Sequence, residues 1–166
     1  MAGPDGNGGA VQPPAGEEQR IGVRILGQYI KDLSFENPNV LKLVGGLTDK
    51  PNLQVEVNVG YAKVSDKVYE SAINFRAEAA NKTGIIYELE LIYAGLFQVE
   101  NMPEQALEPF LVINGPALLF PFLRRLVADL TREGGFPPLL LDPIDFAGLY
   151  VQRQQQGGQA AAKPTN

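Results

Sequence analysis

The spacing of apolar residues changes once along this chain, from every second residue to about every 3.6 residues, and this change strongly constrains the fold. Over residues 53–59, leucine and valine alternate with Gln, Glu and Asn, the pattern of a strand with one hydrated face. Residues 68–77 and 85–97 are rich in β-branched and aromatic residues, and Asn-Lys-Thr-Gly at 81–84 is typical of a hairpin turn. These three segments predict an antiparallel meander.

A fourth, longer strand is predicted over residues 24–36, upstream of the meander. It ends at Asn37-Pro38-Asn39, because the residue before a proline and the proline ring both disfavour further strand pairing. Asp32 and Glu36 have the same parity on this strand, so their carboxylates are expected on one face. Glu88 and Glu90 share a face of the strand at 85–97 in the same way.

Two helices are predicted after the strands. The first begins at Pro116 and ends at Gly134-Gly135, because proline suits a first helical turn and glycine suits a helix end. The second begins at Asp142, which can cap the helix, with Pro143 in its first turn. Strands followed by helices predict an α+β fold, a four-stranded antiparallel sheet with two helices on one side. One side of the first helix is apolar and consists of Leu119, Phe122, Leu123, Leu126, Val127 and Leu130.

The two ends of the chain differ in composition from its middle. Residues 1–19 contain eight glycines or prolines, and residues 154–166 contain no large apolar side chain. Such segments bury too little apolar surface to offset the entropy of ordering. We therefore expect disordered tails at 1–19 and 154–166, flanking one domain at 20–153.

Composition disfavours several classes of function. With 14 basic and 19 acidic residues the net charge is −5, so a phosphate backbone is an unlikely partner and no nucleic acid is expected. The chain has no histidine and no cysteine, which removes the usual general base, thiol nucleophile and metal ligands. We expect no enzymatic activity, no cofactor and no metal. Asp142 and Asp145 are the nearest candidate carboxylate pair, and helix capping explains them better.

Location is predicted from segments that the sequence lacks. The first residues have neither the basic nor the apolar region of a signal peptide. The longest apolar run, residues 116–123, is far shorter than a membrane span. The expected location is the cytoplasm, without direct membrane insertion.

Four stretches, GQYIKDLSFENPN (27–39), GLF (95–97), LFPFLRRLVADL (119–130) and GGFPPLLLDPIDFAGLYVQR (134–153), together resemble the SecB family of bacterial protein-export chaperones. The resemblance implies a homotetramer, built as a dimer of dimers. It also implies ATP-independent binding of unfolded precursor proteins in a hydrophobic groove and their delivery to the SecA motor. A second reading is a SecB-like adaptor or toxin-antitoxin chaperone that protects one dedicated partner.

The resemblance also implies roles for particular residues. Asp32, Glu36 and Glu90 occupy positions that in SecB contact the small, basic, zinc-binding C-terminal tail of SecA, and the zinc belongs to that partner. Glu88 matches no family role and is read as solvated charge. The apolar chain after Gly134-Gly135 would form part of the client groove, although these side chains could equally fill the domain's own core. The groove set is Val40, Leu41, Leu43, Phe97, Phe110, Phe136, Leu139 and Leu141.

Subunit assembly is expected to use the apolar face of the last strand and the helix over it. The residues concerned are Leu89, Leu91, Tyr93, Phe122 and Leu126. The helix stripe must be buried in either case, so the same residues could instead form the core within one subunit. Sequence alone does not separate these two interpretations.

Overall fold

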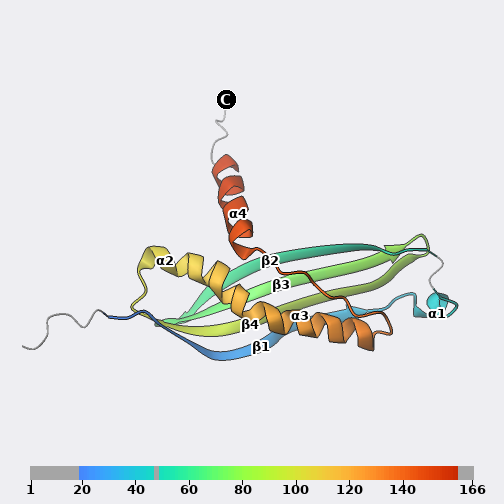
Figure 1. Ribbon diagram of the computed structural model, residues 1–166, viewed down its shortest axis with the longest axis horizontal. Coiled ribbons are helices and arrows are strands. Elements are labelled where there is room, and N and C mark those ends of the chain that lie inside the picture. The colour runs from blue at the N-terminus through green and yellow to red at the C-terminus, as the bar shows by residue number, and fades with distance from the viewer. Residues whose placement is uncertain (1–18, 47–48, 161–166) are drawn as a thin grey trace, which may run out of the picture.

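The computed structural model describes residues 19–46 and 49–160 and shows a long antiparallel sheet with a helical layer across one face (Figure 1). The four strands lie in the order β1-β4-β3-β2, which confirms the predicted α+β class. The strands are β1 (Gly22–Glu36), β2 (Asn52–Ser65), β3 (Val68–Asn81) and β4 (Gly84–Glu100). The helical elements are α1 (Val40–Leu43), α2 (Glu104–Pro109), the π-helical η1 (Phe110–Asn114), α3 (Gly115–Glu133) and α4 (Phe146–Ala160).

The predicted meander is confirmed, because β2 pairs with β3 and β3 pairs with β4, both antiparallel. The turn at 81–84 is held by the Thr83 N–H, which donates to Asn81 Oδ1 at 2.9 Å. Gly84 follows with a φ of 127°, a conformation that residues with a Cβ rarely adopt. The local sequence therefore fixes the register of the β3–β4 hairpin.

Strand β1 ends at the predicted Asn-Pro-Asn corner. The Asn37 side-chain amide donates to the carbonyl of Gly134 at 3.2 Å, and the Asn39 amide donates to the carbonyl of Ile85 at 2.8 Å. These two bonds join the corner to the end of α3 and to the start of β4. The corner thus fixes where the chain leaves the sheet.

Helix α3 begins at Gly115 with Pro116 in its first turn, as predicted, but the helical layer itself begins earlier, at Glu104, because α2 and η1 precede α3. In the π register of η1 the Leu111 carbonyl would accept from the N–H of residue 116, five positions on, but Pro116 has no N–H. The Ser71 hydroxyl of β3 supplies the missing donor and bonds the Leu111 carbonyl at 2.7 Å, with both groups buried. A wider π turn bridges the break, and the Gly115 N–H bonds the carbonyl of Phe110.

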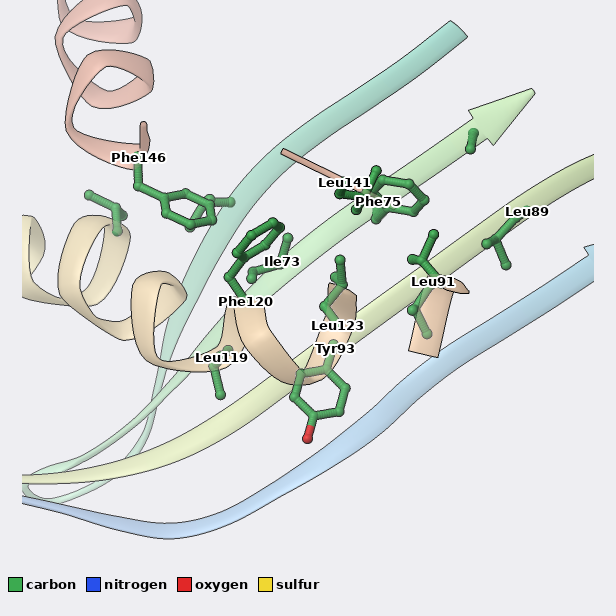
Figure 2. Close-up of a cluster of buried hydrophobic side chains, with 14 of the residues drawn as sticks. Ile73, Phe75, Leu89, Leu91, Tyr93, Leu119, Phe120, Leu123, Leu141 and Phe146 are labelled. Atoms are coloured by element: carbon green, nitrogen blue, oxygen red, sulfur yellow. The ribbon is translucent and has the colours of Figure 1, made fainter. Parts of the chain in front are cut away.

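The core lies between α3 and the middle strands (Figure 2). Leu119, Leu123 and Val127 of α3 are fully buried, as expected for the inner side of an amphipathic helix. Ile73 of β3 and Leu91 of β4 meet them from the sheet. This packing joins the predicted apolar stripe to the inward face of the meander.

Helix α4 differs from prediction at its start. It begins at Phe146, and its capping residue is Asp145 rather than Asp142, because Asp145 Oδ1 accepts the Gly148 N–H at 2.9 Å. Its first turn packs on the helical layer, where the Phe146 and Phe120 rings lie 6.1 Å apart. It then projects away beside β2 (Figure 1). The helix continues to Ala160.

Candidate functional site

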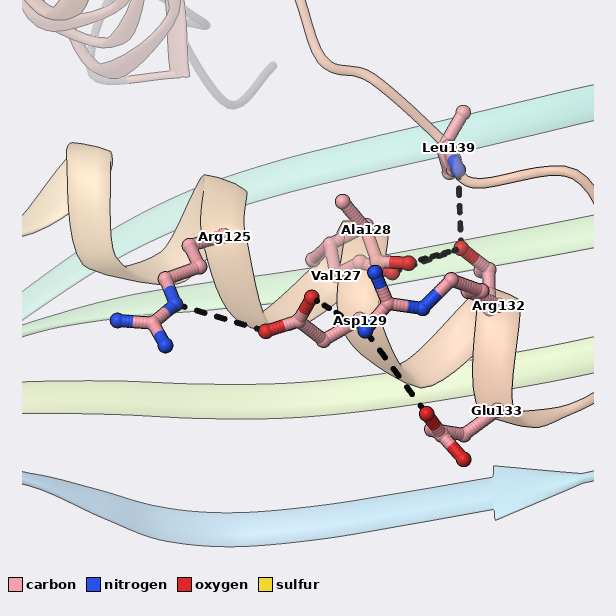
Figure 3. Close-up of polar contacts among 8 residues, drawn as sticks. Arg125, Val127, Ala128, Asp129, Arg132, Glu133 and Leu139 are labelled. Atoms are coloured by element: carbon pink, nitrogen blue, oxygen red, sulfur yellow. Dashed lines mark hydrogen bonds and ion pairs between the residues drawn. The ribbon is translucent and has the colours of Figure 1, made fainter.

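The linker at 134–145 returns over the sheet from α3 to α4 (Figure 1). Thr131, which is buried at the end of α3, holds it in place, and Figure 3 shows Leu139 of the linker above this end of α3. The Thr131 hydroxyl lies 2.9 Å from the carbonyl of Val127 and 3.1 Å from that of Ala128, and it accepts the Leu139 N–H at 2.9 Å. One side chain therefore fixes the middle of an otherwise irregular segment.

The linker's apolar side chains mostly face inward. Leu141 is 7% exposed and belongs to the core, whereas Leu140 is 67% exposed. Phe136 is partly buried, with its ring 5.0 Å from that of Tyr87, and Leu139 is partly buried against the core. The linker thus covers part of the core through Leu141, while Phe136 and Leu139 remain partly accessible and Leu140 is exposed.

Two residues of the predicted groove set are not accessible in this structure, and their assignment is corrected. Phe97 is fully buried beneath the ring of Phe110, which meets it edge to face at 5.8 Å. Leu141 is buried as well. For both residues the alternative interpretation holds, because their side chains fill the core of this protomer.

The other residues of the predicted groove set lie in different parts of the structure. Val40 and Leu41 of α1 are exposed, Leu41 at 86%. Leu43 turns inward and joins Phe136 in a small apolar cluster around Ile86. The structure therefore brings α1 and the linker together, and it does not bring the whole set onto one surface.

An apolar cleft that sequence reasoning missed lies between α4, η1 and β2. We call it the α4 cleft. It has a volume of about 170 Å³ and continues past Arg153 into a shallower hollow of about 370 Å³. Nothing in the sequence pattern placed α4 beside β2, although Leu149 and Tyr150 on that helix were an available signal. The apolar lining of the cleft consists of Val57, Val59, Val112, Phe146, Leu149 and Tyr150.

The cleft opens onto one edge of the sheet. The alternating residues Leu53, Val55, Val57 and Val59 lie on the helix side of β2, since each pairs with an inward residue of β3. We call them the apolar strip. Exposure rises along the strip, from 9% at Val59 inside the cleft to 42% at both Val55 and Leu53. The strip is therefore a half-open apolar path that leads into the cleft.

The opposite face of the sheet is acidic. The two predicted carboxylate pairs, Asp32 with Glu36 and Glu88 with Glu90, lie together on it, so Asp32, Glu36 and Glu90 share one face. Ser34 pairs with Glu90 and Glu36 pairs with Glu88 across β1 and β4, so these side chains project on one side. Asp32 and Glu90 line one shallow hollow together with Arg76. All three predicted carboxylates are exposed.

Arg76 is the basic residue at the centre of this acidic face. Its guanidinium bonds Glu88 and lies 3.7 Å from a Glu78 oxygen and 3.6 Å from a Glu90 oxygen. The bond to Glu88 raises the pKa of Arg76, which stays charged. Glu88 is thus mainly engaged with Arg76, whereas Glu90 is 53% exposed and available to a partner.

The predicted assembly residues divide between core and surface. Leu89 and Leu91 are buried beneath the protomer's own α3, so their assignment to a subunit interface is corrected to intramolecular core. Phe122 is 49% exposed, and its ring stacks on that of Tyr93 at 6.3 Å. Tyr93 pairs with Ile30, which is exposed on the edge strand β1. An open apolar flank therefore runs from α3 to β1, with Leu126 partly buried in it.

The described residues contain no cluster of acidic side chains that could hold a metal ion. One helical run among the described residues, Glu104–Glu133, is long and apolar enough to cross a membrane by length and composition. The same run carries the stripe that packs on the sheet. Its apolar character is thus accounted for by core packing and by the open flank.

These features define a class of α+β protein, with one helix-covered sheet face, one acidic face and an apolar path beside an edge strand. The family model for the preprotein translocase subunit SecB matches residues 16–157. This chain belongs to the SecB family of protein-export chaperones.

Individual relatives agree with this assignment. The chain is 51% identical to the protein-export protein SecB of Parvibaculum lavamentivorans, over 96% of this chain and 92% of that protein. It is 47% identical to the SecB of Zymomonas mobilis, over 81% of each. Among solved structures, it resembles a SecB-like chaperone of Mycobacterium tuberculosis in complex with an antitoxin peptide. The TM-score is 0.59 at 17% identity, over 74% of this chain and 90% of that one, which supports the fold.

Proposed function

We propose that this chain is an ATP-independent cytoplasmic chaperone that binds unfolded precursor proteins and delivers them to SecA for export. The observation that carries the proposal is the apolar strip, which leads from the open edge of β2 into the α4 cleft. Folded proteins hide their apolar segments, so a half-open path of this kind favours non-native chains. The partly exposed Phe136 and Leu139 and the exposed Val40 and Leu41 extend the available apolar surface.

The expected affinity of one site is modest. Burying four aliphatic or aromatic side chains contributes roughly 6–12 kcal/mol before costs. Ordering a flexible client costs about 2–5 kcal/mol or more, and association itself costs several more. A long unfolded chain would gain by contacting several copies of the site. This argument favours an oligomer. The family resemblance implies a homotetramer, a dimer of dimers, and we propose that the open flank around Phe122 holds it in part.

SecA would dock on the acidic face. Asp32, Glu36 and Glu90 are exposed and share that face, which suits the small basic tail of SecA, whose bound zinc belongs to SecA. Opposite charges across an interface accelerate association and set its register. The client surface lies on the other side of the sheet, so one subunit could hold a client while it contacts SecA.

The client site is tested by Tyr150→Asp, which places a charge in the α4 cleft. Suppression of the aggregation of a chemically unfolded protein, measured by light scattering without nucleotide, should weaken several-fold because a buried charge is costly. Val151→Asp is the matched control, since Val151 is the neighbouring residue, is 52% exposed and does not line the cleft. Equal loss in both variants would place the client site elsewhere.

The docking face is tested by Asp32→Arg. Binding to SecA should weaken, with a smaller effect at high salt, while client binding stays unchanged. Glu133→Arg is the control, because it makes the same charge change at a 78% exposed side chain on α3. If Asp32→Arg reduced client binding as much as SecA binding, the two surfaces would not be separate.

The dedicated-partner alternative uses the same surfaces and differs in its clients. Capture of bound polypeptides from cells should return many unrelated precursors. Recovery of one partner alone would favour the adaptor or antitoxin-protecting role.

A further inference from the structure

Strand β1 contains a one-residue bulge beside the acidic face. Among the described residues it is an edge strand that pairs with β4 alone (Figure 1). Ile30 pairs with Tyr93, and the next pair along the strands is Asp32 with Ile92. Lys31 is therefore an extra residue without a partner on β4. An extra residue of this kind is a β-bulge, and it changes the face from which the following side chains project.

The bulge decides the orientation of the docking carboxylates. Before it, the odd-numbered Tyr29 projects on the acidic face, whereas after it the even-numbered Asp32 and Glu36 do so. Phe35 lies on the helix side and packs against the core. Simple alternation from Tyr29 would instead turn Phe35 outward and both carboxylates inward. The acidic face thus depends on the extra residue at position 31.

Three side chains hold the bulge in place, and we call them the β1 clamp. The Glu70 carboxylate of β3 accepts hydrogen bonds from the Tyr29 hydroxyl and from Lys31 Nζ, the latter at 2.6 Å. The Glu70 side chain is only 14% exposed, so these bonds form where water competes little. Tyr29 lies just before the bulge and Lys31 is the bulged residue itself. The clamp therefore fixes both to one point on β3.

The clamp crosses the sheet over two small residues. Tyr29 pairs with Ala94 of β4, and Ala94 pairs with Ala72 of β3. Both alanines are buried, although the neighbouring outward residues Asn74 and Leu96 are partly exposed. Small side chains in this row leave room for the longer ones of β1 to reach β3. The clamp thus ties the edge strand to a strand with which it shares no backbone pairing.

We propose that the β1 clamp positions Asp32 and Glu36 for docking by holding the bulge at Lys31. This inference rests on the proposed docking of SecA and adds residues that act through the carboxylates. A device of this kind is needed because an edge strand has a neighbour on one side only, and a bulge interrupts its ladder. Without the clamp, fewer molecules would present both carboxylates outward, and apparent affinity falls with the fraction of binding-competent molecules.

Lys31→Met separates positioning from simple charge. The variant keeps the apolar stem, removes the ammonium group from the clamp and makes the face more acidic by one charge. If Lys31 acted through its charge alone, a basic partner would bind more tightly. The clamp predicts the opposite, a loss of roughly fivefold to tenfold in affinity. Calorimetric titration of the full-length protein with zinc-loaded SecA measures the change.

Lys67→Met is the matched control. Lys67 also pairs with a glutamate, Glu100, at 2.9 Å, but it lies in the β2–β3 turn, away from the bulge. Its replacement should leave the affinity for SecA unchanged or slightly raised. Tighter binding by Lys31→Met, or the same loss in both variants, would overturn the proposal and leave the docking function standing. No binding of SecA by the parent protein would overturn both.

A double-mutant cycle tests whether the clamp acts through Asp32. In an Asp32→Asn background the charge to be positioned is absent, so Lys31→Met should cost clearly less affinity than it does in the parent. A loss of general stability would not depend on that background. The same fold-loss in both backgrounds would therefore overturn the positioning role.

Tyr29→Phe provides a variant without any charge change. It removes the hydroxyl donor of the clamp, so SecA binding should weaken in the same direction as in Lys31→Met. Tyr61→Phe, at a 47% exposed tyrosine on β2, is the control and should bind SecA like the parent. Suppression of client aggregation should be unchanged in both variants, which shows that they are folded. Parent-like SecA binding by Tyr29→Phe would contradict the clamp.

Discussion

Ser71 shows how one residue can stabilise a break in a helix. It donates to a carbonyl that Pro116 leaves without a partner, in a buried contact between β3 and η1. Ser71→Ala should therefore reduce the free energy of unfolding by about 1–3 kcal/mol, because a buried carbonyl loses its only side-chain donor. Urea unfolding measures the change, with the exposed Ser65→Ala as the control. Similar values for the two variants would contradict this role.

Glu70 joins the edge strand β1 to β3 through Tyr29 and Lys31. Its carboxylate accepts from the Tyr29 hydroxyl and from Lys31 Nζ, the latter at 2.6 Å. The hydrogen bond from Lys31, followed by that from Tyr29, lowers the pKa of Glu70, and the bond to Glu70 raises the pKa of Tyr29 to about 12. Near neutral pH, Glu70 is therefore ionised and Tyr29 is protonated, so the hydrogen bond between them is kept.

The lowered pKa of Glu70 predicts a pH dependence of stability. Its contribution is present above the carboxyl pKa of the unfolded chain and is lost as pH falls through the folded-state pKa. Glu70→Gln should therefore be less stable than the parent at pH 7, and the difference should shrink under acid conditions. Urea unfolding from pH 7 to pH 3 measures it, and a constant difference would contradict the assignment.

Thr131 positions a whole segment of the chain, because its side chain fixes the linker between α3 and α4. Thr131→Val removes the acceptor of the Leu139 N–H and keeps the side-chain shape, so the Leu139 amide should lose hydrogen-exchange protection. The Phe136 amide is an internal control, since it bonds the Thr131 backbone carbonyl at 3.1 Å. Loss of protection at both amides would indicate general unfolding of the linker instead.

Elements with local determinants were the ones that could be predicted from sequence. The strands, the turn at 81–84 and the shared face of Asp32 and Glu36 follow from parity and turn chemistry. The start of the helical layer did not, because a π turn and Ser71 compensate for Pro116. The prediction of Asp142 as the cap failed because Asp145 is three residues before Gly148 and reaches its N–H.

The sequence did not predict which of the large apolar side chains are accessible to solvent. Phe97 and Leu41 are both large and apolar, yet one is fully buried and the other is 86% exposed. The α4 cleft depends on contact between residues about ninety positions apart, such as Arg153 and Val59. Residue type and spacing alone do not contain that information.

At the scale of the whole molecule, the open flank should hold subunits together. Phe122→Asp places a charge where Phe122 is 49% exposed and stacked on Tyr93. Native mass spectrometry should then show smaller assemblies than the tetramer proposed for the parent, because burying an unpaired charge at an interface is costly. Leu140→Asp, at a 67% exposed linker site, should leave the assembly intact. A tetramer that survives Phe122→Asp would assign assembly to another surface.

The central claim is that the apolar strip and the α4 cleft remain accessible and select for the non-native state of a client. Calorimetric titration with one protein in two forms, native α-lactalbumin and its reduced, carboxymethylated form, tests it most directly. The unfolded form should bind with a negative heat-capacity change from apolar burial, and the native form should give no binding. Comparable affinity for the two forms would contradict the account.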